Sequence, residues 1–309
     1  MCARRRKSDE YRDVDGIVIL DKALGLSSNR ALQQLRGEYQ ARKAGHCGSL
    51  DPLASGVLPV CLGEATKFSS YLLGAGKSYR AHCRLGQVTT TGDAEGEVVA
   101  SAVVDVDTAR IEAVLAQFVG VIEQVPPMYS ALKHEGKRLY QLAREGKEVE
   151  RAPRSIEIYS LELLSFEDDT LVIDVACSKG TYIRTLAEDI GARLGCGAHL
   201  SALRRTRVDV FDEADAITIE QLQELRQQGG LGAIDAMLLP VATALSRFPE
   251  IVLNSSDSID MCHGRPVTPG SSAMPGPCRM SSAEGDFIGL GEVGENGELV
   301  AKRLMNTAR

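Results

Sequence analysis

The 309-residue chain lacks tryptophan, and aromatic residues make up only 5% of it. No apolar run approaches the roughly 18 residues that a membrane-spanning helix needs. The strongest runs, Ile17–Leu20 and Leu171–Val175, have the length of strands. Basic residues Arg4–Lys7 are not followed directly by an apolar stretch, which argues against a secretory signal. We therefore expect a cytoplasmic protein that does not contact membranes.

Paired cysteines and nucleotide-binding motifs are also missing. The eight cysteines are widely spaced and form no CxxC motif, which indicates reduced thiols rather than a disulfide framework. No GxGxxG, Walker loop, HExxH or GxSxG motif occurs, which argues against nucleotide-driven enzymes, zinc proteases and α/β hydrolases. His46 has only the adjacent Cys47 at ligand spacing, so a metal site there is not expected. The sequence predicts neither a cofactor nor a metal ion.

The remaining composition, 44% hydrophobic and 25% charged, is that of a globular protein, and the length suggests two domains. A change in composition after Pro240 places the domain boundary near residue 247. We expect a larger domain at 1–247 and a small β-rich domain at 248–309. In the small domain, Phe287–Val293 and Leu299–Leu304 have the pattern of a hairpin, and Ser271–Ser282 has that of an extended loop.

Strands and helices are expected to be mixed in the larger domain. The predicted strands are Gly16–Leu20, Val57–Leu62, 78–86, 96–104, Ser155–Leu164 and Leu171–Cys177. Helices are expected after a cap at Ser27 or Ser28, at 108–119, at 135–145, after Ser178–Gly180, and from Thr218 to about Gln228. Thr185 and Glu188 have capping-box spacing, which predicts that Tyr182–Arg184 lie just before their helix.

The net charge of −7 conceals two basic segments. Residues 1–90 carry a surplus of six positive charges, and residues 178–207 a surplus of four. Such segments can bind a nucleic-acid backbone where the fold brings them together, although imbalances of this size also occur on solvated surfaces.

Asp51 is the first candidate for chemistry. An Asp-Pro step is typical of a turn, but Leu50 and Leu53 would place this carboxylate against an apolar wall. A carboxylate in such surroundings needs a nearby cation to remain ionised. Arg184 is a candidate for that cation, with a surface arginine on a helix as the alternative.

Further candidates have two interpretations each. Tyr79 and Tyr182 offer flat faces for a nucleobase, but tyrosines in such segments also pack into cores. The basic run Leu203–Arg207 either binds phosphate or is solvated.

Taken together, these segments resemble the TruB family of tRNA pseudouridine synthases. The resemblance extends from Gly16 to Pro240, with a weaker PUA-like match at 248–309. The matching blocks, in chain order, are Asp21–Ser28, Ala44–Gly56, Leu62–Lys67, Lys77–Tyr79, Leu85–Gly86, Gly92–Gly96, Gln124–Lys133, Cys177–Thr185 and Leu203–Arg205. Two positions depart from the family pattern: Ala23 stands where proline is usual, and Cys47 stands where threonine is usual.

The resemblance implies an α+β fold: a mixed or antiparallel pseudouridine-synthase sheet with flanking helices, plus a PUA-like pseudobarrel. It implies that a T-loop uridine of tRNA, conventionally numbered 55, is flipped out and isomerised to pseudouridine without a cofactor. The residue roles that it implies are Asp51 as catalytic carboxylate, Arg184 as its partner, Tyr79 for stacking and proton transfer, Tyr182 and Leu203 as pocket walls, His46 as the RNA-loop contact, and Lys22, Lys67, Lys179, Arg204 and Arg205 as RNA-binding residues.

Other classes of function remain as alternatives. An RNA chaperone without catalysis is disfavoured by the presence of Asp51, Tyr79 and Arg184. A guide-dependent, dyskerin-like synthase is disfavoured because the N-terminus is short and no long lysine-rich tail is present. A metal-dependent nuclease is disfavoured because carboxylates do not cluster around Asp51. We expect a monomer that binds the tRNA T-arm and needs no protein partner.

Overall fold

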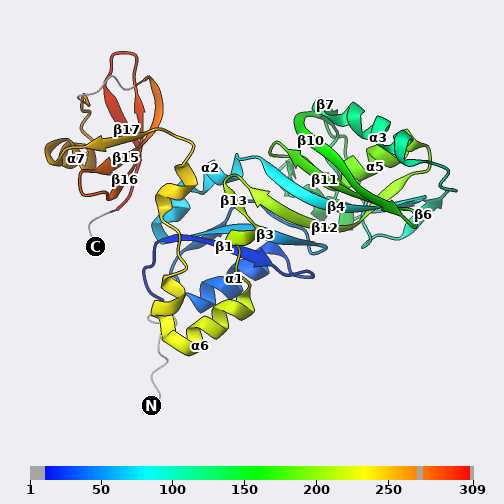
Figure 1. Ribbon diagram of the computed structural model, residues 1–309, viewed down its shortest axis with the longest axis horizontal. Coiled ribbons are helices and arrows are strands. Elements are labelled where there is room, and N and C mark those ends of the chain that lie inside the picture. The colour runs from blue at the N-terminus through cyan, green and yellow to red at the C-terminus, as the bar shows by residue number, and fades with distance from the viewer. Residues whose placement is uncertain (1–10, 270–273, 307–309) are drawn as a thin grey trace.

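A single large sheet forms the centre of the computed structural model, which describes residues 11–269 and 274–306 (Figure 1). Its strands are β1 (Gly16–Lys22), β2 (Ala44–His46), β3 (Ala54–Leu62), β4 (Lys77–Leu85), β7 (Gly120–Gln124), β10 (Arg154–Glu167), β11 (Thr170–Cys177), β12 (Ala198–Val208) and β13 (Phe211–Asp212). The order is β1-β3-β12-β4-β11-β10-β7, with β2 beside β3 and β13 beside β12. Only the β3–β12 pair in this sheet is parallel among the described strands.

Helices and short strands surround the sheet. The helices are α1 (Ser28–Glu38), η2 (Gly63–Phe68), α2 (Ser69–Leu73), α3 (Thr108–Leu115), η3 (Ala116–Phe118), α4 (Leu139–Arg144), α5 (Ile183–Leu194), η4 (Glu213–Asp215), α6 (Ile219–Asp235) and η5 (Val241–Leu245). A further helix, α7 (Ser255–Cys262), packs instead on the C-terminal strands. Two small antiparallel ribbons pair β5 (Gln87–Thr89) with β6 (Val98–Ser101), and β8 (Lys133–His134) with β9 (Lys137–Arg138). Mixed strands and helices confirm the predicted α+β class.

The two ends of the sheet are covered differently. At the β1–β3 end, Val18 and Leu20 pack with α1 and α6, whereas Ile17 and Ile19 pack on the opposite face with η2 and α2. Both faces of β1 are therefore buried, which explains its unbroken apolar sequence. At the other end, α3 and α5 cover one face of β4, β10 and β11. There Leu171 and Ile173 are buried, whereas the alternate residues of β11 are half-buried.

The predicted cap of α5 is wrong. The helix begins at Ile183 with Tyr182 as its N-cap, three residues earlier than a cap at Thr185 would give. Gln124 of β7 explains this start, because its side-chain oxygen accepts from Tyr182 N at 2.8 Å and its amide nitrogen donates to Tyr182 O at 3.1 Å. Arg184 therefore lies in the first turn of a regular helix.

Other sequence-based boundaries are confirmed only in part. The Ser27 cap of α1 and the Thr218–Gln221 capping box of α6 are confirmed. Helix α6 extends past the predicted end near Gln228 to Asp235, with non-helical backbone at Gly230. The helix predicted at 135–145 is shorter, and its first residues form the β8–β9 ribbon instead.

The small C-terminal β domain has its own four-stranded sheet, in the order β14-β15-β16-β17. Its strands are β14 (Glu250–Leu253), β15 (Gly276–Ser282), β16 (Phe287–Val293) and β17 (Leu299–Leu304). The predicted β16–β17 hairpin is confirmed. The predicted loop at Ser271–Ser282 is wrong from Gly276 on, because this stretch pairs with β14 on one side and β16 on the other. Residues 271–273 of that loop lie outside the described part.

The small domain packs directly against the segment that follows β3. Phe287 and Phe68 meet edge to face with ring centroids 5.5 Å apart, and Asn306 N donates to Glu64 at 2.7 Å. Leu290 belongs to the same apolar cluster as Phe68. The end of β3 is therefore tied to the small domain.

Within the described residues, no helix is both long and apolar enough to cross a membrane.

Candidate active site

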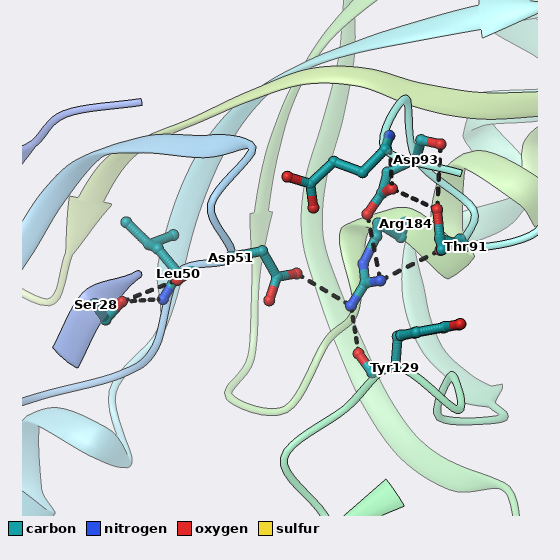
Figure 2. Close-up of polar contacts among 8 residues, drawn as sticks. Ser28, Leu50, Asp51, Thr91, Asp93, Tyr129 and Arg184 are labelled. Carbon is teal, nitrogen blue, oxygen red and sulfur yellow. Dashed lines mark hydrogen bonds and ion pairs between the residues drawn. The ribbon is translucent and has the colours of Figure 1, made fainter. Parts of the chain in front are cut away.

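The loop that carries Asp51 is held in place on both sides. Ser28 Oγ accepts from Leu50 N at 2.7 Å and donates to Leu50 O at 3.0 Å, which anchors the loop to the start of α1 (Figure 2). Asp51 O accepts from Ala54 N, and Pro52 O accepts from Gly25 N. The Asp51 side chain remains 53% exposed, so it is fixed at its base and open to a substrate.

Arg184 is the partner of Asp51, as the geometry of its guanidinium shows. Nη2 lies 3.1 Å from Asp51 Oδ2 and donates to Tyr129 O at 2.6 Å. Nη1 lies 3.3 Å from Asp93 Oδ2 and donates to Thr91 O at 3.2 Å. The Arg184 side chain is only 8% exposed, so two carboxylates and two carbonyls compensate for the water that it loses.

Asp93 is a further residue of the site, because it pairs with Arg184. The sequence alone did not predict this role. Its side chain is 3% exposed, and Oδ1 accepts from Thr91 Oγ1 at 2.6 Å and from Glu95 N at 3.1 Å. Figure 2 shows Arg184 between this buried carboxylate and Asp51. The available signal was an aspartate within a Gly-Asp-Ala-Glu-Gly turn, a pattern that would equally suit an ordinary loop.

The two tyrosines and Leu203 come from three neighbouring elements: β4, the start of α5, and β12. Tyr79 is on β4 and is 7% exposed, and burial raises the pKa of its phenol. Tyr182 is half-buried at the start of α5, and burial raises its pKa as well. The negative charge of Asp51 also raises the pKa of both phenols. Leu203 lies on β12 opposite Ala54, three residues beyond Asp51, and packs against the core.

His46 ends β2, four residues before Leu50, and is half-buried. Burial and the charge of Arg205 lower its pKa below the usual 6.5, so the ring is neutral at pH 7. Its Nδ1 is buried and makes no hydrogen bond within the described chain. The neighbouring Cys47, at one of the two positions that depart from the family pattern, is buried with Sγ 3.5 Å from Cys61 Sγ.

The expected phosphate-binding role of Arg205 is wrong. This side chain is fully buried, with Nε donating to Val57 O at 2.6 Å and Nη2 donating to Gly48 O at 3.1 Å. Adjacent residues of a strand point to opposite faces, so Arg204 lies on the other side of β12. There it pairs with Asp21 at 2.8 and 3.1 Å and with Glu213. Its charge is therefore matched by two carboxylates rather than exposed for RNA.

Two of the expected RNA-binding lysines also have internal partners. Lys22 is fully buried, and Nζ donates to Ala23 O at 3.0 Å and to Leu26 O at 2.6 Å. Burial lowers the pKa of Lys22 to about 8, and the charge of Asp51 opposes that shift.

Lys67 pairs with Glu64 and donates to Leu304 O at 3.1 Å, which joins the two domains. Of the expected RNA-binding lysines, Lys179 alone is exposed, in the turn between β11 and α5.

Among the described residues, no three His, Cys, Asp or Glu side chains come together in a way that could hold a metal ion.

Models of protein families match three consecutive parts of the chain. They are the TruB family pseudouridylate synthase (N terminal domain) at 36–183, the tRNA pseudouridylate synthase B C-terminal domain at 184–246, and Pseudouridine synthase II TruB, C-terminal, at 249–305. Proteins named tRNA pseudouridine synthase B from Stutzerimonas stutzeri (strain A1501) and from Methylobacillus flagellatus are each 52% identical to it. These alignments cover 96% of this chain and 97% of each relative.

Two solved structures have a similar fold over nearly the whole chain. A chain from a crystal structure of a Cbf5-Nop10-Gar1 complex is 27% identical with a TM-score of 0.73, covering 98% of this chain and 87% of that one. A chain from an H/ACA RNP bound to a substrate RNA containing 2'-deoxyuridine is 25% identical with a TM-score of 0.75, covering 99% and 89%.

The fold and the family matches together define the class of pseudouridylate synthases. Within that class, the chain belongs to the TruB family, as its sequence predicts.

Proposed function

We propose that this chain isomerises uridine to pseudouridine in tRNA, and that its target is the T-loop uridine conventionally numbered 55. The observation that carries the proposal is the half-exposed Asp51 carboxylate, paired with buried Arg184 at 3.1 Å and surrounded by Tyr79 and Tyr182. The names of relatives that are 52% identical over nearly the whole chain support a tRNA substrate.

The first step is access to the base. A uridine stacked in the T-loop must leave the stack before a carboxylate can reach its sugar or ring. His46 lies on the segment that leads to Asp51, and its neutral ring can occupy the space beside displaced bases. Aromatic rings stack on bases without needing a charge.

The second step is the chemistry at the nucleoside. The C1′–N1 bond breaks, the base turns, and C5 bonds to C1′ as the C5 proton leaves. No electron donor or transferred group is needed. Asp51 acts in this step, by attack at C1′, by addition to the base or by proton abstraction towards a glycal, and Arg184 keeps it ionised and oriented.

The third step is retention of the loosened base. Tyr79 and Tyr182 provide flat walls, and Leu203 contributes an apolar side. Tyr79 also accepts the proton from C5. Because all three side chains belong to β4, α5 and β12, elements packed in one core, the pocket is preorganised.

RNA binding relies on exposed cations near this pocket, of which Lys179 is one. The shape of the folded T-arm then selects the substrate. We place the enzyme in the cytoplasm. Because one chain supplies every group that the mechanism uses, we propose that it acts as a monomer without a protein partner.

Tritium release from a T-arm stem-loop containing [5-³H]uridine tests the function. The purified chain alone should release tritium, and Asp51→Asn should abolish release while RNA affinity changes by less than about threefold. The matched control is Asp105→Asn, at an exposed carboxylate, which should retain full release.

Two outcomes would contradict the proposal. Binding without release by the unchanged protein would favour an RNA chaperone. Release only after addition of a guide RNA and protein partners would favour a guide-dependent synthase.

A further inference from the structure

Arg205 is a buried cation that the proposed steps leave without a role. Its side chain is fully buried at the centre of β12, and two of its nitrogens donate to the carbonyls of Val57 and Gly48. The third, Nη1, is buried and makes no hydrogen bond within the described residues. A buried donor without a partner costs free energy, so its presence in a native fold calls for an explanation.

Tyr79 lies directly opposite Arg205 on the neighbouring strand β4. Residues that face each other across an antiparallel pair project from the same side of the sheet. The positive charge of Arg205 lowers the pKa of the Tyr79 phenol, against the larger effect of burial. The other charged or titratable groups facing Tyr79 are Cys177 from β11 and Asp51 from the catalytic loop.

The carbonyl contacts of Arg205 connect it to the catalytic loop as well. Gly48, which accepts from Nη2, lies three residues before Asp51. Val57, which accepts from Nε, is on β3, the strand that begins after Asp51. One guanidinium therefore holds both sides of the loop, and it belongs to the residue that faces Tyr79 across the sheet.

We propose that Arg205 is a positioning residue for the isomerisation: it fixes the Asp51 loop and presents Nη1 to the phenol oxygen of Tyr79 when that oxygen is negatively charged. This inference rests on the proposed function. In the proton-transfer step, the C5–H bond breaks and the proton bonds to the Tyr79 phenolate. The electron pair of that bond forms the C5–C6 double bond, and the π pair of the C6–N1 double bond moves to N1, which takes up a proton from water.

Two physical effects support this role. Burial raises the pKa of Tyr79, and the guanidinium opposes that shift. A donor that is already oriented in a dry site stabilises developing charge without reorganisation. Such donors are often misaligned before substrate binds, which accounts for an Nη1 that has no acceptor in the free protein.

A double-mutant cycle tests the coupling, with single-turnover tritium release as the measurement. Arg205→Lys should slow release by about 10- to 100-fold, with RNA affinity changed by less than about threefold. In a Tyr79→Phe background, the same substitution should slow release further by less than about threefold, since its partner is missing. Arg36→Lys is the matched control, because Arg36 also donates to two carbonyls but lies outside the site.

The pH profile separates this role from a merely structural one. The rate of tritium release should increase with pH as Tyr79 ionises. Arg205→Lys should move the midpoint of this increase to a pH about one unit higher. If Arg205→Lys does not fold, Arg205→Gln replaces it, because a neutral amide is less costly to bury than a misplaced charge. It should show the same dependence on Tyr79.

Each remaining outcome is decisive. Equal losses in both tyrosine backgrounds, with an unmoved pH profile, would overturn the inference and leave Arg205 a structural residue. Absence of tritium release from the unchanged protein would instead overturn the proposed function, and this role with it.

Discussion

Arg184 lies between two carboxylates that differ greatly in exposure. Asp93 is 3% exposed and Asp51 is 53% exposed. The inner carboxylate neutralises the buried guanidinium, and the outer one remains accessible for chemistry. Burial of an arginine with a single half-solvated partner would be far less favourable.

Loss of the inner carboxylate should therefore reduce catalysis. We expect Asp93→Asn to slow tritium release by about 10- to 100-fold, because Arg184 then turns fully towards Asp51 and its position is no longer fixed. Stability should fall by about 3 kcal/mol in urea unfolding, since a buried charge loses a partner.

The control for this experiment is an exposed ion pair. Asp212 lies 3.5 Å from Arg207, and both side chains are well exposed. Asp212→Asn should change stability by less than about 1 kcal/mol and leave release intact. Equal effects of the two substitutions would contradict the role given to Asp93.

Residue types and their order in the sequence predicted that Arg184 is the partner of Asp51. They did not predict that Arg204 and Arg205 would have partners within the protein. Arg204 and Arg205 point to opposite faces of β12, and both faces are covered in this part of the sheet. Alternation alone cannot say which of two consecutive arginines is internal. The partners that decide it, Asp21 and Gly48, are more than 150 residues away in the chain.

Helix α5 is the element that delivers Tyr182 and Arg184, and it packs very closely on β12. A Cβ at Gly191 would lie 2.3 Å from Ala198 N, a backbone atom that cannot move aside. Gly191 is therefore required by this contact between helix and strand rather than by its backbone angles.

Substitution of this glycine should displace the whole helix. We expect Gly191→Ala to lower the free energy of unfolding by about 2 kcal/mol through overpacking, and to reduce tritium release because Arg184 shifts with its helix. Urea denaturation and single-turnover release measure the two effects.

The matched control is Gly37 in α1, where a Cβ would meet nothing within 4 Å. Gly37→Ala should leave release unchanged and stabilise the protein by about 0.5–1 kcal/mol, the usual gain in a helix. Destabilisation by both substitutions would show that helix packing at Gly191 is not the cause.

Apolar periodicity predicted most elements because it reflects local burial. The alternation in β11 and the unbroken run in β1 both correspond to faces that are buried in the structure. The start of α5 could not be predicted in this way. Gln124, which fixes Tyr182 as the cap, is 58 residues distant, so local capping signals gave a false start.

At the scale of the whole molecule, the two domains are joined by specific contacts. Phe287 of the small domain packs edge to face on Phe68, and Lys67 donates to Leu304 O. These contacts could not be predicted from the sequence, because a lysine at position 67 can equally bind RNA or donate to a carbonyl of another domain.

Removal of the ring at the junction should uncouple the domains. We expect Phe287→Ala to lower the stability of the small domain by about 2 kcal/mol and to split thermal unfolding into two transitions. Differential scanning calorimetry measures this. Val252→Ala, at an exposed position in β14, is the control and should retain the unaltered melting profile. A single unshifted transition in Phe287→Ala would contradict the coupling.

Strand β3 connects the two regions that matter for substrate. Its nine residues start just after Asp51 and end at the segment that contacts the small domain. A strand of that length spans roughly 30 Å. The strand thus acts as a fixed spacer between Asp51 and the second domain. Under the proposed function, we expect an RNA that touches both to match this separation, so that substrate length becomes a criterion for selection that no single side chain encodes.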